Sequence, residues 1–209
     1  HGYVKARAPR GLRGAEVYLG GSFGSSVLAT ANVMTAAVLA RGTTTIENAA
    51  CEPELVDLAD FLNQMGAKIS GHGSHRIEIK GAGKLHGARH AIIPDRIEAG
   101  TFLVAGAMIP GGDVTVKNCI PEHSHALMDK LRQAGLNVQK TKNSIRVRRS
   151  GRLRPVDVTT LPYPGFPTDL QAQMMALMTL TPGICVITEK IYPDRFIHVS
   201  ELNRMGSHV

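Results

Sequence analysis

The feature of this sequence that most constrains its fold is an internal repeat of about 70 residues, which runs through all 209 residues. Two kinds of glycine recur with this period, one after the first helical segment of each copy and one after the second. The first kind is Gly42, Gly112 and Gly183, spaced by 70 and 71 residues. The second kind is Gly66, Gly135 and Gly206, spaced by 69 and 71 residues. Two independent markers with one period indicate tandem copies of a supersecondary unit.

Each copy has the same expected order of elements, β-α-β-α-β-β. Apolar periodicity and turn residues predict, in the first copy, helices over 26–40 and 54–65 and strands over 16–19, 43–48, 67–69 and 76–80. They predict, in the second copy, helices over 98–109 and 124–134 and strands over 113–117, 136–139 and 144–148. They predict, in the third copy, helices over 169–180 and 198–205 and a strand over 184–188. The first helix of each copy is apolar nearly all round, which predicts burial between sheets, whereas the second is amphipathic and is expected to cover the outside.

The repeats predict an α/β (α+β) fold and a division of the chain. One full repeat spans 11–81, a second spans 84–150, and an incomplete third spans 152–209. The third copy stops before its last pair of strands, and residues 2–6 have the pattern of a strand that closes an earlier copy. We therefore expect the sequence to be a fragment of a longer protein.

Composition restricts the classes of partner. The net charge of +7 suits a phosphorylated metabolite, a nucleotide or nucleic acid. Aromatic residues make up only 4% of the chain and tryptophan is absent, which disfavours a stacking platform for single-stranded nucleic acid. The one dense basic group runs from Arg146 to Arg154, where a solvated strand face is favoured over a polyanion-binding patch.

The cysteines and the hydropathy pattern restrict the compartment. Cys51, Cys119 and Cys185 are odd in number and far apart, which argues against a disulfide framework or a zinc site and fits a reducing cytoplasm. No apolar run reaches membrane-spanning length, and no signal-peptide pattern is present. The histidines lie mostly in turns without metal-ligand spacing, so we expect them at the surface.

A proline-rich segment leads directly into the first helix of the third copy. Pro164 and Pro167 fix their own φ angles and disfavour a helical conformation in the residues before them. Thr168 is expected to cap the following helix, with Asp169 in its first turn, where negative charge suits the helix dipole. The segment therefore holds one carboxylate on a rigid turn, and this pattern alone favours a capped helix start over a functional acid.

Five motifs, in this order along the chain, give the sequence a specific resemblance to the UDP-N-acetylglucosamine enolpyruvyl transferases (1-carboxyvinyltransferases). They are GYVKA at 2–6, ENAACEPE at 47–54, IPDRIEAGT at 93–101, FPTDLQAQ at 166–173 and DRFIH at 194–198. The resemblance covers essentially the whole chain.

The resemblance implies an inside-out α/β prism of two domains with the active site in the cleft between them. Residues 1–93 would close the first domain, and residues 94–209 would open the second. The implied reaction transfers the enolpyruvyl group of phosphoenolpyruvate to the 3′-hydroxyl of the UDP-sugar with release of phosphate, in the first committed step of peptidoglycan synthesis. The implied enzyme is cytoplasmic, needs no metal or organic cofactor, and acts on small molecules rather than on nucleic acid or a membrane. The sequence gives no oligomeric state.

By the same resemblance, Asp169 matches the aspartate that takes the proton from the attacking sugar hydroxyl. A carboxylate fixed on a pre-shaped turn suits that role. Ile191 and Tyr192 match the segment that contacts the sugar, partly through its backbone, and Thr168 is placed with the substrate-binding residues. Because the family's phosphoenolpyruvate-binding lysine and arginines lie outside this sequence, we expect the 209 residues alone to have no turnover.

Two arginines are candidates for anion binding, each with a structural alternative. The guanidinium of Arg195 can pair with a phosphate or carboxylate of a ligand, or with Asp194 or Glu201 of the protein. Arg96 can bind phosphate or pair with Glu98.

The glycine-rich loop over 20–26 joins a strand to the first helix. Its glycines permit close approach of the backbone to a ligand, and the helix N-terminus presents free N–H groups to an anion, although an ordinary βα turn has the same pattern. Ser26 and Val27 match the family's serine and valine at this place. The family's nucleotide-contacting lysine has no counterpart here, and the loop is about three residues longer.

Glu52 and Asp95 match acids that line the cleft of the family. Proton handling, or a hydrogen bond to the catalytic base, is one role for them, and capping of the helices that follow is the other. The family's reactive cysteine or aspartate lies on a loop upstream of this sequence, so the three cysteines are interpreted as buried or bystander thiols.

Two rival functions stay open. The sister enzyme that acts on shikimate 3-phosphate shares the fold, but residues 94–98 and 166–173 match the UDP-sugar group more closely. A non-catalytic module that binds phosphate or nucleic acid through the basic charge is the alternative of a different class.

Overall fold

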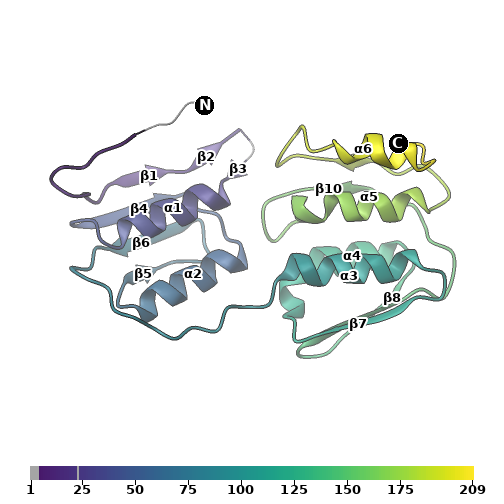
Figure 1. The fold of residues 1–209 in the computed structure, drawn as a ribbon, viewed down its shortest axis with the longest axis horizontal. Helices are drawn as coiled ribbons and strands as arrows, with labels where there is room; N and C mark the ends of the chain where they lie inside the picture. Colours follow the sequence, from purple (N-terminus) through teal and green to yellow (C-terminus); the bar gives the residue numbers. More distant parts are fainter. Residues whose placement is uncertain (1–4, 23) are drawn as a thin grey trace. The chain divides into compact units, whose positions relative to one another are not determined.

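The computed structural model describes residues 5–22 and 24–209. It divides into two compact units, His1–Ile93 and Pro94–Val209 (Figure 1). Residues 2–4 of the GYVKA motif and Phe23 of the glycine-rich loop lie outside the described residues. Each unit combines helices with sheets, so the predicted α/β (α+β) class is confirmed. The helices of the described residues are all too short or too polar to cross a membrane.

The first unit is a four-stranded sheet with two helices packed on it. The strand order is β1-β4-β6-β5. Strand β1 (Glu16–Tyr18) is parallel to β4 (Thr43–Glu47), and β6 (Arg76–Lys80) is antiparallel to both β4 and β5 (Lys68–Ser70). Helices α1 (Val27–Ala37) and α2 (Pro53–Gln64) lie on the same face of this sheet (Figure 1). A short hairpin of β2 (Gly20–Gly21) and β3 (Gly24–Ser25) connects β1 to α1.

Alternation along the strands determines which face of this sheet is buried. Ile46 pairs with Ile77 and Ile69 pairs with Ile79, and all four side chains are buried under the two helices. Successive side chains of a strand point to opposite faces, so the charged residues between these isoleucines face away from the helices. Burial of each isoleucine contributes roughly 1.5–3 kcal/mol to hydrophobic stabilisation. The short strands are therefore held by their packing against the helices.

The second unit contains two further copies of the repeat. The first of these has a sheet of order β7-β9-β8, made of β7 (Asp113–Lys117), β9 (Ser144–Arg148) and β8 (Asn137–Lys140). Its helices are α3 (Arg96–Met108), the 3₁₀ turn η1 (Pro121–Ser124) and α4 (His125–Gln133). The other copy contains the parallel strands β10 (Val158–Thr159) and β11 (Ile187–Thr188), the 3₁₀ turn η2 (Thr168–Leu170), α5 (Gln171–Thr179) and α6 (His198–Arg204).

The repeat that the glycine spacing predicted is visible in the backbone. Sheets β4-β6-β5 and β7-β9-β8 have the same strand order and the same antiparallel pairing. Asn48 follows β4 and Asn118 follows β7, and both have a φ of 56°. The cap glycines have positive φ as well, a conformation that glycine adopts readily just after a helix; they are Gly66, Gly135 and Gly206.

Three features of the predicted elements are wrong. The strand expected over 184–188 is reduced to Ile187–Thr188, and Ile184 is 91% exposed. No strand lies between β6 and α3 in residues 81–95, which the structure describes in full, so the second copy lacks the first strand of the predicted order. Helix α1 is less buried than its composition predicted, with Leu28 75% exposed, because only one side of the helix contacts the sheet of its own unit.

Candidate active site

Asp169 lies on a turn that is fixed on both sides by buried side chains. Phe166 is 3% exposed and Leu170 is 2% exposed, so the residues that flank the turn are anchored in the core of the second unit. The side chain of Asp169 is 54% exposed. The sequence therefore builds an accessible carboxylate on a turn whose flanking residues are anchored in the core.

The predicted capping role of Thr168 is wrong. Thr168–Leu170 is a 3₁₀ turn, and α5 begins only at Gln171. The N–H groups of Leu170 and Gln171 already donate to the carbonyls of Pro167 and Thr168, so they are not available to the side chain. The Thr168 hydroxyl instead donates to Oε2 of Glu189 at 2.8 Å. Thr168 thus ties the turn to the loop after β11.

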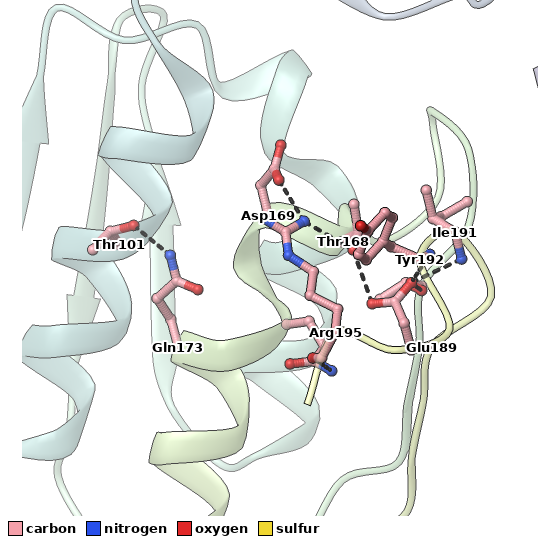
Figure 2. Close-up of polar contacts among 10 residues, drawn as sticks. Thr101, Thr168, Asp169, Gln173, Glu189, Ile191, Tyr192 and Arg195 are labelled. Carbon is pink, nitrogen blue, oxygen red and sulfur yellow. Dashed lines mark hydrogen bonds and ion pairs between the residues drawn. The ribbon is translucent and has the colours of Figure 1, made fainter. Parts of the chain in front are cut away.

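Arg195 contacts both residues of the turn with one nitrogen. Its Nη1 donates to Oδ1 of Asp169 at 2.6 Å and to the Thr168 hydroxyl at 3.0 Å (Figure 2). The sequence suggested Asp194 or Glu201 as the ion-pair partner within the protein, and this is wrong, because the partner is Asp169. Both side chains are well exposed, so the pair contributes only about 0.2–1 kcal/mol to stability. Its main effect is to orient the carboxylate.

This arrangement leaves one oxygen of Asp169 open. Oδ1 is bound by Arg195, whereas Oδ2 has no hydrogen bond to any residue that the structure describes. A fixed carboxylate with an open oxygen can accept a proton from an alcohol that comes within hydrogen-bond reach. Asp169 therefore has an oxygen to which an alcohol could donate.

Glu189 is the residue of this site that the sequence did not indicate. Its Oε1 accepts hydrogen bonds from the Thr160 hydroxyl (2.5 Å) and from the N–H groups of Ile191 (2.8 Å) and Tyr192 (3.0 Å). Partial burial alone would raise the pKa of Glu189, but these hydrogen bonds and the one from Thr168 together hold the pKa below its usual value. The only signal in the sequence is an acidic residue directly after the strand of the third copy.

The residues predicted for catalysis and acceptor binding in the second unit lie in one cluster (Figure 2), consisting of Thr168, Asp169, Ile191, Tyr192 and Arg195. The N–H of Arg195 donates to the carbonyl of Tyr192 at 2.9 Å, so the segment after β11 folds back onto the arginine. Tyr192 is 64% exposed. An exposed ring and an open carboxylate leave this surface accessible to a ligand.

Asp95 and Arg96 lie at the start of α3 in the same unit. Oδ1 of Asp95 accepts from the N–H groups of Ile97 (2.7 Å) and Glu98 (3.1 Å), so the capping alternative for Asp95 is observed. The guanidinium carbon of Arg96 lies 5.4 Å from the ring centre of Tyr163, in the proline-rich segment, whose Tyr163–Pro164 peptide bond is cis. The start of α3 therefore contacts the segment that leads to Asp169.

Helices α3 and α5 are packed side by side. Nε2 of Gln173 donates to the Thr101 hydroxyl at 3.0 Å (Figure 2). The α-carbon of Gly100 is so close to Leu170 that a Cβ there would lie 2.6 Å from Leu170 Cδ1. Glycine at this place in α3 lets the turn that holds Asp169 pack closely against the helix.

Ser26, Val27 and Glu52 belong to the first unit. Ser26 is the N-cap of α1, and its Oγ accepts from the N–H of Ala29 at 3.2 Å, while Val27 is the first residue of the helix. Glu52 occupies the N-cap position of α2, but its carboxylate makes no capping hydrogen bond and the residue is only 8% exposed. Capping thus accounts for Ser26 and not for Glu52, and the part of all three in substrate binding stays a prediction.

The cysteines have the properties of unreactive thiols. Burial raises the pKa of the Cys51 thiol, and the neighbouring Glu52 raises it further. Burial likewise raises the pKa of Cys119 and of Cys185, so all three thiols are protonated at neutral pH and are weak nucleophiles. Within residues 5–22 and 24–209, no three His, Cys, Asp or Glu side chains form a group that could hold a metal ion.

Residues 1–209 match the family of EPSP synthase (3-phosphoshikimate 1-carboxyvinyltransferase). The chain belongs to this family. The UDP-N-acetylglucosamine 1-carboxyvinyltransferase of Solibacter usitatus is 58% identical over 210 residues, and UDP-N-acetylglucosamine 1-carboxyvinyltransferase 2 of Carboxydothermus hydrogenoformans is 56% identical over 211 residues. Both matches include the whole of this chain and 49% of the relative. The chain thus spans about half the length of the curated relatives it matches, and the resemblance seen in its motifs is confirmed.

The fold is that of a solved enolpyruvyl transferase. The crystal structure of NikO from Streptomyces tendae superimposes with a TM-score of 0.80 over 93% of this chain and 48% of that chain, at 21% sequence identity. At this identity the similarity concerns the fold alone, and it confirms the predicted fold type for an incomplete enolpyruvyl transferase.

Proposed function

We propose that this chain forms the acceptor-activating part of an enolpyruvyl transferase, which transfers the enolpyruvyl group of phosphoenolpyruvate to the 3′-hydroxyl of UDP-N-acetylglucosamine. The observation that carries the proposal is Asp169, an exposed carboxylate on a rigid turn, held at one oxygen by Arg195 and open at the other. The names of the relatives that are more than half identical support this pair of substrates.

In the proposed reaction, Oδ2 of Asp169 accepts the proton of the 3′-hydroxyl while the alcohol oxygen attacks C2 of phosphoenolpyruvate. A proton is added to C3 in this stage. In the second stage a base takes a proton from C3 as phosphate leaves from C2, which restores the double bond, and the proton that Asp169 took leaves with the phosphate. One carbon–oxygen bond forms, one breaks, and no electrons are exchanged with a cofactor, so the proposal includes neither metal nor organic cofactor.

The other predicted residues have supporting roles in this proposal. Ile191, Tyr192, Thr168 and Arg195 bind the acceptor beside Asp169. Ser26 and Val27 bind substrate, Glu52 and Asp95 handle protons or hydrogen-bond the base, and Arg96 binds phosphate. Residues 1–93 close one domain and residues 94–209 open the next in a cytoplasmic enzyme of peptidoglycan synthesis. The 209 residues alone have no turnover.

The test is a chimaera in which the 210 matched residues of the Solibacter usitatus relative are replaced by this chain. We expect the chimaera to release phosphate from phosphoenolpyruvate only when UDP-N-acetylglucosamine is present. Asp169→Asn in the chimaera should lower kcat by roughly 10²–10⁴-fold, because it removes the base and keeps the shape. Full activity of Asp169→Asn would contradict the proposal.

The second candidate is transfer to shikimate 3-phosphate, which the name of the matching family favours. The same chimaera separates the two acceptors, because each is offered alone with phosphoenolpyruvate. Phosphate release with shikimate 3-phosphate and not with the UDP-sugar would support the second candidate. Inactivity with both acceptors, together with salt-sensitive binding of the 209-residue chain to random oligonucleotides, would favour a non-catalytic module.

A further inference from the structure

We infer that Glu189 is a positioning residue, which sets the direction of the Asp169 carboxylate by binding the Thr168 hydroxyl on one side and the N–H groups of Ile191 and Tyr192 on the other. The inference rests on the proposed role of Asp169 as a base. It assigns to Glu189 a function that neither the motifs nor the comparisons indicate.

The carboxylate of Glu189 joins three separate segments of the chain. It binds Thr160 after β10, Thr168 in the turn before α5, and the N–H groups of Ile191 and Tyr192 in the loop after β11. Thr160 is fully buried, and its hydroxyl also accepts the N–H of Lys190 at 2.9 Å. The anchor at this end is therefore rigid, and Glu189 transmits its position to the turn and to the loop.

The link from Glu189 to Asp169 is a directed sequence of hydrogen bonds. The Thr168 hydroxyl has one hydrogen, which it donates to Glu189, so its lone pairs face Nη1 of Arg195 (Figure 2). The same Nη1 donates to Oδ1 of Asp169. An ionised carboxylate can only accept hydrogen bonds, so Glu189 determines that the Thr168 hydroxyl donates to it. The hydroxyl can then only accept from Arg195.

The charge of Glu189 matters more than its shape. A glutamine in this place has the same size, but its NH₂ group faces either the Thr168 hydroxyl or the N–H groups of Ile191 and Tyr192. In the first case the hydroxyl hydrogen must turn away, and in the second case donors face one another. Either conflict moves Thr168, and with it the nitrogen of Arg195 that holds Asp169.

The same unit also contains a carboxylate that only joins the ends of two paired strands, and its hydrogen bonds differ from those of Glu189. Asp157 precedes β10, at the other end of the same strand pair, and its Oδ1 accepts one hydrogen bond, from the N–H of Val186 at 2.7 Å. Asp157 has no contact with the turn of Asp169 that the structure shows. The variant Asp157→Asn is therefore a matched control for Glu189→Gln.

The first experiment uses NMR spectra of the 209-residue chain without ligand. We expect Glu189→Gln to shift the backbone amide signals of Ile191, Tyr192 and Asp169 and the side-chain signal of Arg195, whereas Asp157→Asn leaves these four signals in place. Unchanged Asp169 and Arg195 signals in Glu189→Gln would overturn the inference. If Glu189→Ala unfolds the unit, Glu189→Gln still decides, because it keeps the size of the side chain and one accepting oxygen in either orientation of its amide.

The second experiment measures kinetics in the chimaera. Since a misplacement of about 1 Å can cost on the order of 10²-fold, we expect Glu189→Gln to lower kcat by roughly 10–100-fold with little change in KM for the acceptor. The variant Thr168→Val removes the linking hydroxyl, and the double variant should be no slower than the slower single variant. Independent, multiplying effects, or an equal loss in Asp157→Asn, would contradict a positioning role.

Failure of the proposed function and failure of the inference about Glu189 give different results. An unmodified chimaera without activity contradicts the proposed function, and the NMR signals of Asp169 and Arg195 still decide whether Glu189 positions the turn. An active chimaera in which Glu189→Gln keeps kcat within about twofold contradicts the inference alone.

Discussion

The close contact between α3 and the Asp169 turn predicts how much stability the protein loses when one methyl group is added at Gly100. In Gly100→Ala the new Cβ would lie 2.6 Å from Leu170 Cδ1 and 2.9 Å from Leu127 Cδ2. Both leucines are at most 2% exposed, so neither can move aside into solvent. Overpacking of a core costs about 1–3 kcal/mol, and the better helix propensity of alanine returns about 1 kcal/mol. We expect a net destabilisation of roughly 1 kcal/mol together with a displacement of the turn.

Substitutions of two other glycines of the second unit serve as controls, because they distinguish a loss of stability from a displacement of the Asp169 turn. In Gly106→Ala the Cβ would lie 2.4 Å from Val114 Cγ2, on the side of α3 that faces the sheet, so we expect destabilisation without a change at Asp169. Gly151 has open space around the Cβ position, and Gly151→Ala should be neutral or stabilising by about 0.4–1 kcal/mol. Urea unfolding of the 209-residue chain gives the stabilities, and the amide signal of Asp169 reports the displacement. A Gly100→Ala variant that is more stable than the parent chain, with the Asp169 signal unmoved, would refute the argument.

Three further predictions concern the second unit. Asp95→Ala removes the cap of α3 and should destabilise the unit by about 0.5–2 kcal/mol in thermal unfolding. Arg149→Ala should cost about 1 kcal/mol in the same measurement, because Nη1 of Arg149 donates to the last carbonyls of α3, with 2.8 Å to Met108 O. The folded state lowers the pKa of Glu189, so its contribution to stability is present above the unfolded pKa of about 4.3 and is lost as the pH falls through the folded pKa. Urea titrations between about pH 3 and pH 7 should show this loss in the parent and less of it in Glu189→Gln; equal slopes would contradict it.

The parts of the fold that the sequence predicted depend on local signals. Gly66, Gly135 and Gly206 mark helix ends because the left-handed conformation after a helix is costly for most other residues. Strands 76–80, 113–117 and 144–148 were predicted with their observed limits, because their alternation of apolar and polar residues continues to both ends. Period and alternation are thus sufficient to locate the repeat.

The parts that the sequence did not predict depend on contacts between distant segments. The hydroxyl of Thr168 binds a residue 21 positions away, and Arg195 binds one 26 positions away, so local capping preferences could not identify either partner. The tight 3₁₀ turn uses the amides that Thr168 was expected to cap. The helix over 26–40 was expected to be buried because it is apolar nearly all round, but Leu28 is exposed, since burial depends on which side of a helix meets another element.

The environments of the two acids in the cluster differ in the way that their proposed roles require. Glu189 has both oxygens occupied by donors and a lowered pKa, so it is a poor proton acceptor and a good anchor. Asp169 has one oxygen oriented by Arg195 and the other facing solvent. Thr168 connects the two acids. Glu189 is charged and has donors at both oxygens, whereas Asp169 is oriented by a donor at one oxygen and keeps the other oxygen open. A site with these roles exchanged would use as its base an acid whose two oxygens already accept four hydrogen bonds.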